Sequence, residues 1–206
     1  MPQFLAQNAD MIGLAMDILM VVIWLTYLQL FFFTIRTQRR PSLHIDRGAA
    51  KDENARLTVT NMGREPIYLL AIVVDLGKDD GTSRAIVTDR SEIAHDDASA
   101  PMDRTNQGPL GQGKTRDIGS LNDIMNRAQR RLNVSVGLNS VRRMWVSAVA
   151  ISHEGERIVA ASKAFSVDHT DNGALQVTPD SVLTDQIRSP LRRRELLTWL
   201  EDRDEV

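Results

Sequence analysis

Residues 11–33 of this 206-residue chain read MIGLAMDILMVVIWLTYLQLFFF, and this stretch decides the architecture of the molecule. It holds a single acid, Asp17, and neither lysine nor arginine. The hydrocarbon core of a bilayer is about 30 Å thick and needs about 20 helical residues to cross it. We therefore predict a transmembrane helix over residues 11–35, preceded by a short tail of residues 1–10.

The flanks of this stretch distinguish an anchor from a cleaved signal peptide. A signal peptide has a basic start and small residues before its cleavage site. Here residues 1–10 contain no basic side chain, and the apolar run ends in three phenylalanines before Arg36, Arg39 and Arg40. We predict a basic juxtamembrane linker over residues 36–41. The positive-inside rule then gives a single-pass protein of the cell (inner) membrane, with its N-terminus outside and its main domain in the cytoplasm.

One face of the predicted anchor carries Gly13, Asp17, Val21, Trp24 and Leu28. Two interpretations stay open. An ionisable residue beside a glycine and an aromatic ring is typical of a face that packs on a partner helix. Alternatively, the face is turned to lipid and the acid lies among the headgroups at the outer interface, because residues 18–35 alone are long enough to span.

After residue 41 the pattern changes to short alternating runs, which are typical of half-buried strands. The two clearest runs flank Glu154 and Gly155, a short turn that predicts a hairpin. We expect a mostly-β domain over residues 42–168, built as an immunoglobulin-like antiparallel sandwich of about seven strands. The predicted strands cover residues 42–46, 55–61, 67–76, 83–88, 114–118, 141–153 and 157–167.

One short helix is expected inside this domain. Ser120 followed by Asp123 is the pattern of a helix N-cap with an acid three positions later. Apolar residues then recur at helical spacing, namely Leu121, Ile124, Met125, Ala128 and Leu132.

Arginines cluster around this helix and before the hairpin. They either form a solvated face paired with acids or contact anionic headgroups. The residues are Arg127, Arg130, Arg131, Arg142 and Arg143.

Residues 57–68 read LTVTNMGREPIY and combine an alternating run, an Asn-x-Gly turn and a proline that restarts the chain. This segment resembles the strand–turn–strand of immunoglobulin-like domains in membrane-anchored bacterial proteins. In such domains the turn and the proline shape a corner between the two sheets. The resemblance implies a fold and carries no activity with it.

The segment from Gly108 to Thr115 matches the P-loop pattern, with Gly108, Gly113, Lys114 and Thr115 in the diagnostic places. A P-loop follows a buried strand and opens a helix. The residues before this segment are polar, and Gly119 falls where the helix should begin. We predict a turn leading into a strand, and keep nucleotide binding as an alternative.

We predict a linker over residues 169–188 and an amphipathic helix over residues 189–206. Ser189 and Pro190 suit a helix start. The apolar residues Leu196, Leu197, Trp199 and Leu200 follow a basic block and suit docking on the domain itself, on a partner or on the membrane.

The composition of the chain argues against several classes of function. A net charge of −2 argues against nucleic-acid binding, and the absence of cysteine excludes disulfides and thiolate chemistry. Four scattered histidines lack metal-ligand spacing, and no catalytic arrangement is found, so we expect neither enzyme activity nor a metal or cofactor. We predict a membrane-anchored interaction module that binds the bilayer and a membrane or cytoplasmic protein, of unpredicted oligomeric state. The alternatives are a nucleotide-binding regulator and an envelope-facing ligand-binding sensor.

Overall fold

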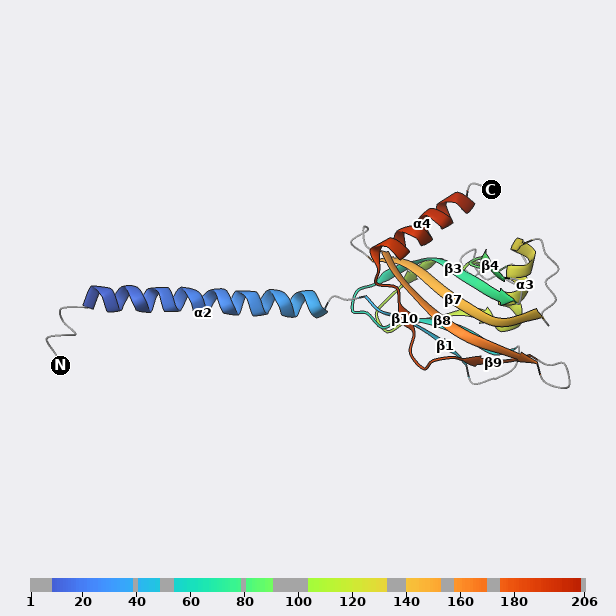
Figure 1. The fold of residues 1–206 in the computed structure, drawn as a ribbon, viewed down its shortest axis with the longest axis horizontal. Coiled ribbons are helices and arrows are strands. Elements are labelled where there is room, and N and C mark those ends of the chain that lie inside the picture. Colours follow the sequence, from blue (N-terminus) through green and yellow to red (C-terminus); the bar gives the residue numbers. More distant parts are fainter. Residues whose placement is uncertain are drawn as a thin grey trace. The chain divides into compact units, whose positions relative to one another are not determined.

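The computed structural model describes residues 9–38, 41–48, 54–78, 81–90, 104–132, 140–152, 158–169 and 175–204. The chain divides into two compact units, Met1–Arg40 and Pro41–Val206, each treated by itself below. Figure 1 labels most of the elements, which in chain order are α2 (Ala9–Gln38), β1 (Leu43–Arg47), β2 (Arg56–Asn61), β3 (Ile67–Lys78), β4 (Gly81–Ile86), β5 (Gly108–Leu110), β6 (Thr115–Ser120), α3 (Leu121–Leu132), β7 (Val141–Ser152), β8 (Ile158–His169), β9 (Leu175–Pro179), β10 (Asp185–Gln186) and α4 (Pro190–Asp204).

The first unit contains the apolar helix α2. Its segment Ala9–Thr34, of 26 residues, is long and apolar enough to cross a membrane. Thr26 and Thr34 each return a side-chain hydroxyl to the backbone carbonyl four residues earlier, at 2.8 Å, so neither hydroxyl is left unsatisfied. The helix continues to Gln38, three residues past the predicted end, because nothing after Ile35 breaks a helix before Pro41.

The second unit is built from two antiparallel sheets. One sheet has the order β1-β2-β6, and the other has the order β10-β8-β7-β3-β4, with β5 added on β3 and β9 on β8. The predicted hairpin is confirmed as β7 and β8, which pair from Arg143 opposite Ser166 to Ile151 opposite Ile158. Its turn at Glu154 and Gly155 lies outside the described residues.

Both sheets contribute apolar side chains to one continuous core. It takes Ile45 and Val59 from the smaller sheet, and Ile72, Met144 and Phe165 from the larger one. The strands β3, β7 and β8 also bury residues on their opposite face, because α4 covers that face. Burial on both faces explains the continuous apolar runs in these strands, residues 69–74 of β3, 148–151 of β7 and 158–161 of β8.

The predicted inner helix is confirmed as α3, and its start is a reciprocal capping box. The Asp123 backbone N–H donates to Ser120 Oγ at 3.1 Å, and the Ser120 backbone N–H donates to Asp123 Oδ2 at 3.3 Å. The apolar face of α3 packs into the core through Leu121, Ile124 and Met125.

The buried Asn61 builds the corner between the two sheets. Its side-chain nitrogen donates to the carbonyls of Glu65 at 2.8 Å and Leu110 at 3.0 Å, while its side-chain oxygen accepts from the Gly63 N–H at 2.9 Å. One side chain thereby fixes the turn after β2 and joins it to β5. Within the segment that carries the family resemblance, Asn61 is the residue that organises the turn.

The prediction of a linker over residues 169–188 is wrong, because β9 and β10 lie there. Residues 180–187, here named the strap, connect β9 to α4 and join the edges of the two sheets. The backbone of β10 pairs with β8, Asp185 opposite Ser162. The side chains of Thr184 and Gln186 bond the backbone of β1 at Ile45 and Leu43, respectively. Because the bonds to β1 come from the polar side chains of Thr184 and Gln186, the segment lacks the alternation of apolar residues by which a strand is predicted from sequence.

Two cationic side chains of the described residues are buried in this unit, Arg127 and Lys163. Arg127 of α3 is 3% exposed and donates to the carbonyls of Val87 and Ile118, each at 2.7 Å. It therefore faces neither solvent nor headgroups, contrary to both interpretations of the arginine cluster. Lys163 of β8 is 2% exposed and reaches Asp46 at 3.5 Å and the strap carbonyl of Val182 at 3.2 Å. Both ammonium and guanidinium groups find partners, as buried charges must.

Candidate interaction surfaces

The predicted partner face of the anchor lies along α2. Asp17, Val21, Trp24 and Leu28 are all exposed on the isolated helix, Trp24 by 72%, and Gly13 opens a gap in the same face. Met20, Val21, Trp24, Leu25 and Leu28 surround a shallow hollow of about 230 Å³. Arg36 lies in the last turns of α2, whereas Arg39 and Arg40 fall outside the described residues.

The P-loop-like segment forms a turn between two strands. Gly108 belongs to β5 and Thr115 begins β6, so the segment is followed by a strand where a P-loop has a helix. The Gly113 N–H donates to the Asn61 carbonyl at 2.8 Å, and the Lys114 N–H donates to the Gly111 carbonyl at 3.1 Å. The Thr115 hydroxyl contacts the Thr60 hydroxyl at 2.9 Å. In a P-loop the backbone N–H groups of such a segment bind phosphates. Here those of Gly113 and Lys114 already donate to backbone carbonyls of the domain.

The C-terminal helix docks on its own domain. Leu196 and Leu200 of α4 are buried in a second apolar cluster with Ala71, Val149 and Ala160, on the face of the larger sheet turned away from the main core. Trp199 packs at the margin of this cluster. Leu197 is half-buried. Pro190 is the first helical residue, as predicted, and it starts the helix directly after the strap has joined β8.

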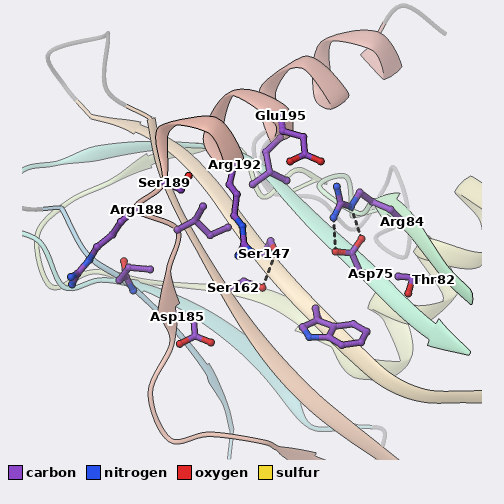
Figure 2. Close-up of a pocket in the computed structure, with 14 residues that line it drawn as sticks. Asp75, Thr82, Arg84, Ser147, Ser162, Asp185, Arg188, Ser189, Arg192 and Glu195 are labelled. Carbon is purple, nitrogen blue, oxygen red and sulfur yellow. Dashed lines mark hydrogen bonds and ion pairs between the residues drawn. The ribbon is translucent and has the colours of Figure 1, made fainter.

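Beside this cluster lies a groove of about 620 Å³ between α4, the strap and the larger sheet (Figure 2). Trp145 lines it from β7 and lies close over Gly77 of β3. A Cβ added to Gly77 would come within 2.9 Å of the indole ring. The glycine therefore allows the ring to lie flat on the sheet. The hydroxyls of Ser147 and Ser162 bond each other at 3.0 Å beside it.

One wall of the groove is an ion pair. Arg84 donates to both carboxylate oxygens of Asp75, at 2.5 and 3.0 Å, and its guanidinium lies 5.3 Å from the centre of the Trp199 ring. The hydrogen bond to Asp75 raises the pKa of Arg84, and the negative charges of Asp75 and Glu195 add to that rise while burial opposes it. The pair thus fixes β3, β4 and α4 relative to one another.

Three further charged side chains line the groove, Arg192, Arg188 and Asp185. Arg192 descends from α4 toward Ser147, and Arg188 and Asp185 project from the strap side (Figure 2). Within the described residues none of these three side chains makes a hydrogen bond or an ion pair. Three arginines and three acids line the groove, so its formal charges cancel.

This groove could not be predicted from the sequence. Its lining comes from β3, β4, β7, β8, the strap and α4, and only two of its residues, Ser189 as part of a helix start and Leu196 as a docking residue, are singled out by the sequence. Among the described residues no group of three or more potential ligands is placed to hold a metal ion. Of the histidines, His44 bonds the Thr184 hydroxyl at 3.1 Å, which is a structural contact to the strap.

Comparisons with known proteins identify no relative. No protein family matches the chain, and neither the curated proteins nor the solved structures contain a match. Function must therefore be argued from the surfaces described above.

Proposed function

We propose that this chain is a membrane-anchored, non-enzymatic interaction module, tethered by α2 and recognising a protein segment in the groove under α4. The groove carries the proposal. It combines an indole ring, a pair of hydroxyls and charges of both signs that have no partner among the described residues, a mixture that suits a polypeptide. A groove of cancelling charge is poorly suited to a polyanion such as nucleic acid.

The architecture supports a recognition role for the second unit. The order β1-β2-β6 opposite β4-β3-β7-β8 follows the order A-B-E opposite C′-C-F-G of immunoglobulin domains. We therefore assign the domain to an immunoglobulin-like sandwich. In such a scaffold, loops and sheet faces bind partners while a rigid core holds them in place.

The proposal is tested by site-specific photo-crosslinking in cells. A benzophenone amino acid at Thr82, which lines the groove, is expected to form adducts with a protein partner. The same group at Met62, exposed on the corner after β2, is the control and is expected to form none. Equal labelling from both positions would contradict a groove-specific interaction.

A charge reversal adds a second control. Arg192→Glu is expected to abolish the adducts at Thr82, because it places an acid where the groove presents an open cation. Arg194→Glu changes an exposed arginine of the same helix outside the groove and is expected to leave them unchanged.

We also propose that α2 places its N-terminus outside and the β domain in the cytoplasm, at the inner membrane. The basic residues after the span support this direction. Paired C-terminal fusions test it: a fluorescent protein should be fluorescent, and a phosphatase active only in the periplasm should be silent. An active phosphatase fusion would instead place the groove in the envelope.

A further inference from the structure

Two side chains inside the apolar segment of α2 carry a carboxylate or an amide, Asp17 and Gln29, and neither makes a hydrogen bond within the described residues. They are 12 residues apart, which corresponds to about 18 Å along a helix. A hydrocarbon core of about 30 Å is too thick for both to reach opposite interfaces. In every register at least one of them lies within about 9 Å of the bilayer midplane, where water cannot satisfy it.

The flanking residues select Gln29 as the deeper group. With Thr34 at the inner boundary, ahead of the basic residues, Gln29 lies about 7 to 8 Å inside the hydrocarbon. In the same register Asp17 lies only about 5 Å from the outer boundary, within reach of headgroups and water. The amide of Gln29 therefore needs a partner from another helix.

The chemistry of an amide points to a second copy of the chain. A glutamine side chain both donates and accepts, so it is its own complement. Copies of a single-pass chain insert in one direction, and a two-fold pair of them places Gln29 beside Gln29 of the second copy at equal depth. A pair formed through the face that carries Asp17 would instead bring two carboxylates together, which is unfavourable for like charges.

The residues around Gln29 suit a close parallel pair. A stripe repeats at alternating steps of three and four residues, the spacing of a left-handed helix pair, and all its members are exposed on the isolated helix. A single polar residue in such an apolar seam fixes the register of the two helices. This Gln29 stripe consists of Ala15, Ile18, Val22, Leu25, Gln29 and Phe32.

We propose that α2 mediates self-association of the chain through the Gln29 stripe, with the two Gln29 amides hydrogen-bonded across the pair. The inference rests on the proposed membrane anchoring and is independent of the groove. It leaves the Asp17 face free for a different membrane partner.

The natural absence of cysteine makes a direct test possible. Single cysteines are introduced in the full chain, reconstituted in phosphatidylcholine–phosphatidylglycerol vesicles and oxidised with copper phenanthroline. Ile18→Cys and Val22→Cys, on the stripe and outside the hollow of the Asp17 face, are expected to form disulfide-linked dimers. Val21→Cys and Leu28→Cys, on the Asp17 face, are expected to stay monomeric. Dimers from the second pair alone, or from none of the four, would overturn the inference.

The hydrogen bond itself is tested by energy transfer between labelled copies in the same vesicles. Gln29→Leu keeps the apolar contact and is expected to weaken association about three- to thirty-fold, the range measured for bonds between membrane helices. Thr26→Val is the control, because that hydroxyl already bonds Val22 within its own helix. Unchanged association of Gln29→Leu would contradict the proposed bond.

Vesicle flotation separates the two proposals. A chain that fails to float with the vesicles would overturn membrane anchoring and the inference together. A chain that floats and remains monomeric at high density in the membrane would overturn the inference alone.

Discussion

The side chain of Gln186 pairs with both backbone groups of Leu43, although 143 positions separate the two residues. Its Nε2 donates to the Leu43 carbonyl at 2.6 Å and its Oε1 accepts from the Leu43 N–H at 3.1 Å. A side-chain amide thus completes the ladder of β1 as a neighbouring strand would. Open strand edges invite pairing with other chains, and this contact protects one.

Gln186→Ala is expected to destabilise the domain by about 1–3 kcal/mol, because it removes two hydrogen bonds from a part-buried strand edge. Urea unfolding followed by circular dichroism measures the change. Gln176→Ala, at an exposed position of β9, is the matched control and should stay within about 0.5 kcal/mol of the natural chain.

Asn61→Ala should be more damaging, at about 2–4 kcal/mol, because it leaves buried partners at Gly63, Glu65 and Leu110 without their bonds. Met62→Ala, 64% exposed on the same turn, is expected to have little effect. Equal stabilities of the two variants in urea would show that the corner does not depend on the Asn61 amide.

Arg127→Met is expected to lower stability by about 2–4 kcal/mol. The apolar side chain fills the space but removes the 2.7 Å donors from the carbonyls of Val87 and Ile118, and leaves Ile118 with only the 3.4 Å bond from Asn106. Arg130→Met changes a neighbouring arginine of α3 whose one described bond is to its own helix, and should be nearly neutral. Thermal unfolding of both variants distinguishes a structural arginine from a surface one.

The docking of α4 depends on two leucines. Leu196→Ala and Leu200→Ala are each expected to speed amide hydrogen exchange across residues 190–204, since each removes a buried side chain from the second apolar cluster. Leu191→Ala, 81% exposed on the same helix, should leave the exchange unchanged. Exchange in α3 serves as the internal reference.

The ion pair between Arg84 and Asp75 gives a prediction about pH. The hydrogen bond to Asp75 raises the folded pKa of Arg84 above that of a free arginine, so the contribution of the pair is fully present below the unfolded pKa and is lost only as pH rises through the folded pKa. The stability difference between the natural chain and Arg84→Met should therefore be the same at pH 7 and pH 10. A difference that shrinks by pH 10 would contradict the pairing.

The strands that could be predicted are those whose side chains alternate or are buried on both faces. Residues 55–61 and the hairpin satisfy these rules, and β2, β7 and β8 begin and end within two residues of the predicted limits. The start of α3 was equally predictable, because a capping box is local chemistry between Ser120 and Asp123.

The features that could not be predicted depend on contacts between distant segments. The β10 strand is only two residues long, its backbone pairs with β8, and the side chains of Thr184 and Gln186 bond to β1, some 140 positions earlier. Arg127 sits among charged neighbours in the sequence, and only the fold shows the two carbonyls that bury it. The groove likewise exists only once α4 lies on the larger sheet.

The strap also has a mechanical consequence. Because β1 is the first strand after α2, a force applied to the second unit through α2 enters the sheets at Leu43. There the strand is held on one edge by β2 and on the other by Thr184 and Gln186. The hydrogen bonds run across the strand, so a pull directed along β1 loads them together in shear and no single bond bears the tension. The strap thus strengthens β1, the strand through which α2 is connected to the sheets.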